Sequence, residues 1–368
     1  MNTVTRRLQD VADWPNRVDE GGNYFAERAK KSVEAVMQHR LGWVGPAAAF
    51  VMALAACGGG PQPASTSQTG QPQQTAGTAG PALGTKNMPP VAGQQKTCAA
   101  PRQKTFDLDV IETTGVDLGM GTTFAAWAYN GRVPGPTIEA CQGDTVTINV
   151  HNKGTTSHGL DTHAFKIDAR KYGPTPPGTT LKIEKTVDTP GVFMYHCAAG
   201  PVTDLHIKSG IHGAMIVYPR DETLRPAREI VVVEDAVYGT RDAKGFIPGT
   251  DPAKTLKNDQ LLSMFNGRLD NEPVRVNPGD LVRMYFVNVG PWVSAAHVIG
   301  TVLDRVYAGA PWVQGVQTFP VPSGAGAILE FYIPETGVFP FVDHDKLAYL
   351  PFGLALAFTT EGVAGAAH

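Results

Sequence analysis

An internal repeat constrains the fold of this chain more than any other feature of its sequence. Matching turn residues recur at one fixed offset of 136 positions. The paired positions are Tyr129–Arg132 with Phe265–Arg268, Gly143–Asp144 with Gly279–Asp280, Asn152 with Asn288, and Gly154 with Gly290. A repeat of this length indicates a duplicated domain, because the short repeats of solenoids recur about every 20–50 residues.

Short runs of alternating or β-branched residues surround these repeated positions and predict strands. They are Thr145–Val150, Leu181–Val187, Gly213–Tyr218, Ile230–Glu234, Leu281–Val287 and Ala327–Ile333. The 41 glycines and 29 prolines of the chain suit the turns of a β protein. The sequence therefore predicts an all-β protein of two β-sandwiches. We place the first domain at about 99–219 and the second at about 226–361, with Pro219–Pro226 as the hinge.

The first 57 residues form a predicted export leader. Arg40 precedes the apolar run Leu41–Ala56, whose 16 residues are fewer than the ~20 that span a membrane. The small residues before Cys57 are typical of a lipoprotein cleavage site, so we predict that Cys57 is lipidated. An ordinary signal peptide or a buried helix is the alternative. Residues 1–36 are unusual ahead of a signal, and we hypothesise a mis-called start, with Met37 as the better one.

Residues 58–98 follow as a predicted disordered linker, because Gly, Pro, Gln, Thr, Ala and Ser offer almost nothing to bury. We expect an exported protein, periplasmic or anchored to the outer membrane, that contacts a membrane only through its lipid. The formal net charge is −3, and no basic run occurs. That balance argues against nucleic acid as a partner.

Two of the four cysteines, Cys98 and Cys141, have no other assigned role. In an oxidising compartment, such a pair predicts a disulfide. On the chain-entropy estimate this bridge adds about 4 kcal/mol of stability. Two unpaired core thiols are the alternative.

The fourth cysteine, Cys197, lies in a motif rich in histidine. One thiolate and two imidazoles make the trigonal ligand set of a blue, or type 1, copper site. Cys197 and His206 are nine residues apart, which suits a strand and a following loop, and His158 comes from an earlier strand. Zinc or a catalytic Cys–His pair are the alternatives. A structural zinc site needs four closed ligands, and a Cys–His pair leaves the further histidines unexplained.

A second set of histidines, His163, His196 and His344, can form an all-imidazole site with one position open. An open position is what a catalytic metal keeps for its substrate. His196 and Cys197 are adjacent, so one residue serves each metal and a short covalent path joins the two sites.

The order of these motifs resembles that of the copper-containing nitrite reductases. The pattern is His158-x-x-Asp161-x-His163, then His196-Cys197, then His206, then His297-x-Ile299, then His344, and it covers about 105–361. The resemblance implies two cupredoxin-like Greek-key β-sandwich domains and two coppers per chain. It implies type 1 ligands at His158, Cys197 and His206, and type 2 ligands at His163, His196 and His344. It also implies a homotrimer in which His344 crosses the subunit interface.

The resemblance further implies that Asp161 and His297 handle protons while Ile299 shapes the nitrite pocket. Reducing nitrite to nitric oxide consumes one electron and two protons, which a carboxylate and an imidazole can supply. The repeat aligns Asp161 with His297, 136 positions later. The alternatives are a strand-end cap or an orienter of a histidine ligand for Asp161, and a satisfied core histidine for His297.

This sequence departs from the family at the position of the axial methionine, five residues after His206, which is Ile211 here. Met215 lies four residues further along a predicted strand, about 13 Å away at ~3.3 Å per residue. His212 is expected to point to the opposite face. We therefore predict a three-coordinate type 1 site with a raised reduction potential.

Two rival functions remain at this point. A two-domain multicopper oxidase would use oxygen at a trinuclear site built from His-x-His pairs, and the sequence contains none. A non-catalytic copper lipoprotein would bind one copper and would not need Asp161, His297 or His344. For the reductase, we expect nitrite as the substrate and a small cupredoxin or cytochrome c as the electron donor.

Overall fold

The computed structural model describes residues 98–360. The predicted leader with its lipidation site at Cys57, and the linker up to residue 97, lie outside the described residues. Within 98–360, none of the helices has the length and apolar character that a membrane crossing requires. The structure joins Cys98 to Cys141 through a disulfide, as the cysteine usage predicts.

The first sandwich consists of two sheets that face each other, built from strands of the first half of the described chain together with β10 of the second half. One sheet has the strand order β10-β2-β1-β4-β6 and the other has the order β3-β8-β7-β5. The strands of these sheets are β1 (Gln103–Gly119), β2 (Thr122–Tyr129), β3 (Ile138–Cys141), β4 (Thr145–Asn152), β5 (Asp161–Thr162), β6 (Thr180–Thr186), β7 (Gly191–His196), β8 (His212–Tyr218) and β10 (Phe246–Ile247).

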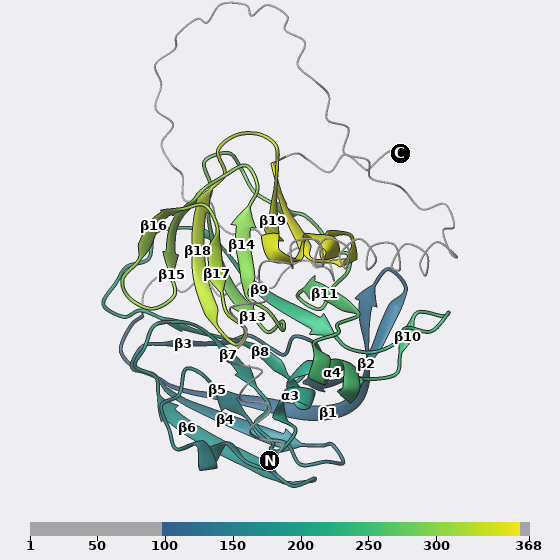
Figure 1. Cartoon of the computed structure of the whole chain (residues 1–368). Helices are drawn as coiled ribbons and strands as arrows, with labels where there is room; N and C mark the ends of the chain where they lie inside the picture. The colour runs from purple at the N-terminus through teal and green to yellow at the C-terminus, as the bar shows by residue number, and fades with distance from the viewer. Residues whose placement is uncertain (1–97, 361–368) are drawn as a thin grey trace, which may run out of the picture. The chain divides into compact units, whose positions relative to one another are not determined.

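The second half forms a second pair of sheets, with the orders β11-β9-β13-β18-β15-β16 and β12-β20-β19-β14-β17. Their strands are β9 (Arg228–Val237), β11 (Leu262–Phe265), β12 (Val274–Arg275), β13 (Leu281–Asn288), β14 (Ser294–Val298), β15 (Leu303–Tyr307), β16 (Val313–Val316), β17 (Phe319–Val321), β18 (Gly326–Tyr332), β19 (Val338–Asp343) and β20 (Ala355–Thr359). Figure 1 shows the strands of the two halves gathered into separate groups, blue to teal and green to yellow. The predicted all-β class with two sandwiches is confirmed.

Within residues 98–360, four short helices connect the strands. They are the 3-10 helix η2 (Ala169–Tyr172), the α-helices α3 (Thr203–Lys208) and α4 (Pro252–Lys257), and the 3-10 helix η3 (His344–Phe352). Asp251 caps α4 by accepting hydrogen bonds from the backbone N–H groups of Ala253 and Lys254.

The repeat in the sequence is a repeat in the structure. Strands β4 and β13 start and end 136 residues apart, and each pairs in parallel with the first long strand of its own sandwich. The Asn-Gly turns bend alike, because Asn130 and Asn266 both have a φ of 54°. After each strand, the side chain of Asn152 or Asn288 accepts a hydrogen bond from the backbone N–H two residues on. The two sandwiches are therefore copies of one architecture.

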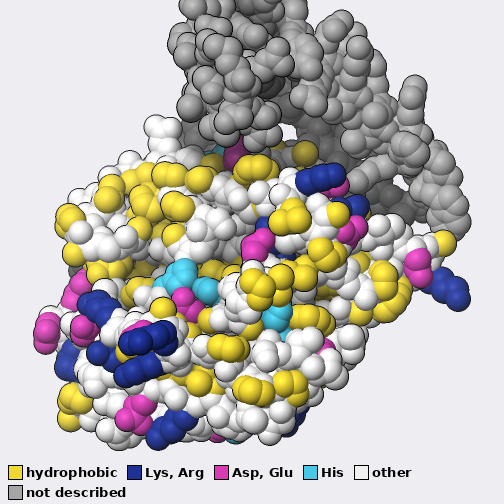
Figure 2. All heavy atoms as spheres, turned by 60° about the horizontal axis from the view of Figure 1, so that its bottom comes forward, with side chains coloured by type: hydrophobic (Ala, Val, Ile, Leu, Met, Phe, Trp, Pro, Cys, Tyr) yellow, Lys and Arg dark blue, Asp and Glu magenta, His cyan; other side chains and the backbone are white. Residues whose placement is uncertain are grey.

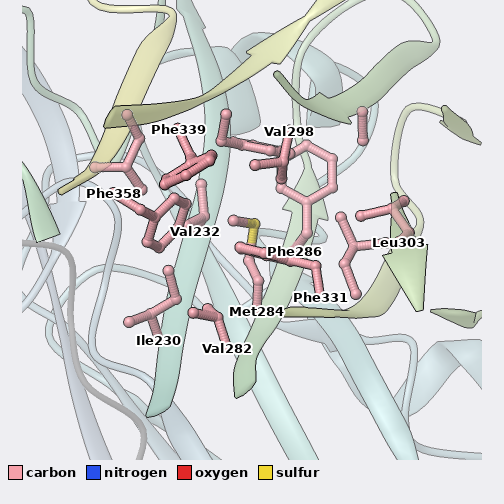
Figure 3. Close-up of a cluster of buried hydrophobic side chains, with 14 of the residues drawn as sticks. Ile230, Val232, Val282, Met284, Phe286, Val298, Leu303, Phe331, Phe339 and Phe358 are labelled. Carbon is pink, nitrogen blue, oxygen red and sulfur yellow. The ribbon is translucent and has the colours of Figure 1, made fainter. Parts of the chain in front are cut away.

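Each sandwich has its own apolar core. The core of the second lies between its sheets and is rich in phenylalanine, as Figure 3 shows for Phe286, Phe331, Phe339 and Phe358. A separate cluster joins the two sandwiches, with Val192 and Ile216 of the first packed with Val231 and Tyr285 of the second. Strand β10 also crosses over, since it pairs with β2 although its sequence lies in the second predicted domain.

Candidate metal centres

His158, Cys197 and His206 form one buried cluster in the first sandwich. Their potential ligand atoms all lie within 4.8 Å of one another. The Sγ of Cys197 is 3.6 Å from Nδ1 of His158 and 3.4 Å from Nδ1 of His206. One sulfur and two ring nitrogens thus converge on one point, as the sequence predicts.

Three separate pieces of chain bring this cluster together. His158 follows β4 and bridges to Thr175, and Cys197 comes directly after β7. His206 lies on α3, so the loop predicted at this position is wrong. The short helix directs the imidazole into the protein, where His206 is only 4% exposed. A close approach also requires glycine at position 159, where a Cβ would sit 2.3 Å from the carbonyl oxygen of Tyr172.

Burial sets the protonation of these groups. It lowers the pKa of His206 to about 4, with His158 adding to the effect. Burial also lowers the pKa of His158, although Glu112 opposes that change. At neutral pH both imidazoles are neutral, which is the form that binds a metal. Burial raises the pKa of the Cys197 thiol, and backbone N–H groups of residues 198, 199 and 159 oppose the rise.

Two neighbours of this cluster were not found by sequence reasoning. The Trp127 ring packs edge-on against the rings of His158 and His206, at centroid distances of 5.5 and 4.9 Å. The Glu112 carboxylate accepts a hydrogen bond from Nε2 of His158 at 2.9 Å. Neither residue belongs to a recognisable sequence motif. For Trp127, the one available signal is its place among alternating buried residues on β2.

The residues after His206 agree with the predicted departure from the family. Ile211 is fully buried, and its carbonyl oxygen accepts a hydrogen bond from the backbone N–H of Cys197 at 3.1 Å. The sulfur of Met215 instead accepts a hydrogen bond from the Thr162 hydroxyl. His212 turns away, with Nε2 3.2 Å from the Asp235 carboxylate.

A second cluster contains Asp161, His163 and His196, again within 4.8 Å of one another. The Nε2 atoms of the two histidines face each other at 3.2 Å, and the Asp161 carboxylate is 3.9 Å from Nε2 of His196. Strand pairing causes this, because Asp161 on β5 lies opposite His196 on β7. Nδ1 of His196 donates to the carbonyl oxygen of Cys197, which leaves Nε2 free to bind a metal.

A cavity of about 440 Å³ opens beside this second cluster. Its lining includes His163, His196 and Lys208 of the first sandwich, and Gly324 of the second. Figure 2 shows histidine side chains at the surface next to an acidic side chain. The cluster is thus open to a small solute, whereas the cluster around Cys197 is closed.

His297 and His344 lie together in the second sandwich, with ring centroids 5.1 Å apart. Nδ1 of His297 donates to the carbonyl oxygen of Gln317, which leaves Nε2 as the free ring nitrogen. Ile299 follows on the same segment and is 42% exposed. Within one chain, the described structure does not bring His344 to His163 and His196, or His297 to Asp161. These five residues form two separate groups, Asp161 with His163 and His196, and His297 with His344.

A buried ionic cluster includes Asp343 and Lys346, which flank His344 in the sequence. Nζ of Lys346 is 2.7 Å from the Glu234 carboxylate and 2.6 Å from that of Asp343. Asp343 also accepts hydrogen bonds from the backbone N–H groups of Ala295 and Asp345, so it ties β14 to the start of η3. The cluster thereby fixes the segments that carry His297 and His344. Sequence reasoning missed it.

Comparison with known proteins points to one kind of enzyme. A sequence family described as multicopper oxidase matches residues 111–222. A copper-containing nitrite reductase of Neisseria meningitidis is 32% identical over 257 residues, which cover 66% of this chain and 66% of that protein. The chain thus spans just under two thirds of the length of that relative. One of Alcaligenes xylosoxydans is 26% identical, covering 73% of this chain and 89% of the relative.

Solved structures agree with these relatives. A copper nitrite reductase from Nitrosomonas europaea aligns with a TM-score of 0.63 and 31% identity, covering 71% of this chain and 94% of that one. A multicopper oxidase aligns with a TM-score of 0.59 at 24% identity, covering 70% of this chain and 88% of that one. It shares the fold.

Proposed function

Because this chain belongs to the family of copper-containing nitrite reductases, we propose that it reduces nitrite to nitric oxide and water with two coppers per chain. One observation carries the proposal. His196 and Cys197 are consecutive residues, and each belongs to a different cluster of potential metal ligands. A peptide link therefore joins a closed sulfur-containing site to an open imidazole site, which suits electron delivery to a substrate.

The donor atoms fit the two kinds of copper. A thiol and two Nδ1 atoms are the set that a type 1 copper takes, and we assign them to Cys197, His158 and His206. Two Nε2 atoms beside a cavity suit a type 2 copper with open positions. We assign His163 and His196 to this second copper.

When bound, the second copper would supply the electron and a Lewis acid for nitrite. The reaction converts nitrite, one electron and two protons into nitric oxide and water. Asp161 stands beside Nε2 of His196 at 3.9 Å, where a carboxylate can hold a proton for the substrate oxygen. His297 can deliver the second proton from Nε2, since its Nδ1 is held by a carbonyl oxygen.

We further propose a homotrimer in which each type 2 site is completed by a second chain. His297 and His344 lie together but apart from Asp161, His163 and His196, which supports two half-sites that meet between subunits. The exposed apolar residues Ile299, Val302 and Leu347 near this half-site supply surface for such a contact. In the trimer His344 would be the third imidazole ligand, and Ile299 would border the nitrite pocket.

We also propose that the protein is exported and lipidated at Cys57. Its electron donor would be a small cupredoxin or a cytochrome c. Export and lipidation place denitrification chemistry outside the cytoplasm, tethered to a membrane by the lipid. The oxidase alternative is disfavoured because the sequence has no His-x-His pair.

The test is anaerobic nitric oxide formation from nitrite by the copper-loaded full chain with an artificial reductant. We expect nitrite-dependent nitric oxide, two coppers per chain, and loss of most turnover in His297→Ala. His151→Ala is the matched control, because His151 is a surface histidine paired with Asp107. A protein that holds two coppers but forms no nitric oxide would refute nitrite as the substrate.

A further inference from the structure

Glu112 occupies a built position beside the type 1 cluster. The register of β1 shifts between Ile111 and Thr114, and Thr113 has a φ of 56°, which non-glycine residues rarely adopt. Val110 lies opposite Asn152 on β4, so the bulge stands next to the loop that leads from β4 to His158. The side chain of Glu112 is only 10% exposed.

Several donors hold the carboxylate in place. Oε1 accepts hydrogen bonds from the backbone N–H and the hydroxyl of Thr156, at 3.0 and 2.7 Å, and Oε2 accepts one from the Thr155 hydroxyl at 2.6 Å. A Cβ at Gly154 would sit 2.7 Å from Oε1. The absence of a side chain at position 154 therefore leaves room for the carboxylate.

The contact with His158 fixes the tautomer of that imidazole. A carboxylate that accepts from Nε2 requires Nε2 to carry the hydrogen, so Nδ1 presents its lone pair toward the Cys197 sulfur. In the described part of the chain, Nε2 of His206 has no such carboxylate partner. The two imidazoles of the cluster therefore differ as donors, and His158 is the more basic one.

We propose that Glu112 is a positioning residue that lowers the reduction potential of the type 1 copper. A more basic His158 stabilises oxidised copper more than reduced copper. This offsets the rise expected from Ile211 in place of an axial methionine. The inference rests on the proposed copper ligands but not on nitrite as the substrate.

The test is a redox titration of the copper-loaded full chain, followed by its thiolate–copper visible band. In Glu112→Gln we expect the band to persist. The potential should rise by about 59 mV, which corresponds to a tenfold change in the ratio of oxidised to reduced copper. Glu184→Gln is the matched control. Like Glu112, Glu184 is a carboxylate that accepts a hydrogen bond from a threonine hydroxyl, but it lies on β6. Its replacement should leave the reduction potential of the type 1 copper unchanged.

A second variant displaces the carboxylate without changing charge. Gly154→Ala should push Oε1 away from His158 and raise the potential in the same direction. An unchanged or lowered potential in both variants, with the band intact, overturns the role of Glu112. A wild-type protein without the visible band overturns the type 1 assignment as well. A normal titration without nitrite turnover would overturn only the substrate.

Discussion

His196 and Cys197 are neighbours in the chain, yet their side chains enter different clusters. Nε2 of His196 is 3.2 Å from Nε2 of His163, and Sγ of Cys197 is 3.4 Å from Nδ1 of His206. Successive side chains of an extended chain point to opposite faces, and these two residues lie where β7 ends. One peptide unit thus separates a buried donor set from one that borders a cavity.

The two clusters should be separable by mutation. We expect Cys197→Ser to abolish the visible band and to lower copper from two ions to one per chain, since the imidazole site keeps its ligands. His163→Ala should keep the band and lose the other copper. Metal analysis and absorption spectra of the two variants check this. Loss of both coppers in each variant would contradict the separation.

Asp161→Asn should retain copper but lose about 100-fold or more of the nitrite turnover. The amide keeps the shape of the side chain next to His196 but cannot hold and release a proton. Steady-state rates with copper content measured on the same samples give the answer. Asp188→Asn, at an exposed carboxylate paired with Lys166, is the control. Wild-type rates in Asp161→Asn would refute a proton-handling role.

Ile211→Met should lower the reduction potential of the type 1 site. The residue is fully buried and bonded through its backbone to Cys197, so a thioether there can reach the copper. Exchanging two apolar side chains of similar volume should change the free energy of unfolding by less than about 1.5 kcal/mol. Redox titration and chemical denaturation measure the two effects. An unaltered potential would mean that position 211 does not face the metal.

Glu234→Gln should change how stability depends on pH. Burial raises the pKa of Glu234 from 4.5 to about 7, with Asp343 adding to the rise and Lys346 opposing it. Between pH 4.5 and about 7, Glu234 keeps its proton in the folded protein but has released it in the unfolded chain. The wild type therefore loses stability as the pH rises toward 7.

The Gln variant lacks this titration. Relative to the wild type, it should therefore gain stability from about pH 4.5 to 7, by roughly 3 kcal/mol at most. Denaturant unfolding at several pH values measures the difference, with Glu184→Gln as an exposed control. A difference that stays constant with pH would show that Glu234 does not titrate in this window.

Much of the fold could be read from local patterns. The repeat predicted two equivalent sandwiches, and β4 and β13 begin 136 residues apart as expected. The cysteine usage predicted the Cys98–Cys141 bridge. The spacing of His158, Cys197 and His206 predicted one cluster, although His206 comes from a helix rather than a loop. The metal roles of these residues and the domain boundaries remain predictions.

By itself, the sequence determined the kind of chemistry. It holds Cys197 and several histidines in a fixed order, and it places His196 next to Cys197. Only the tertiary structure decided which carboxylates pair with which distant side chains. Glu112 reaches His158 across 46 positions because β1 bulges beside the loop after β4. Glu234 and Lys346 meet across 112 positions because buried opposite charges must pair. Such contacts depend on strand register and burial, which no local pattern of residues encodes.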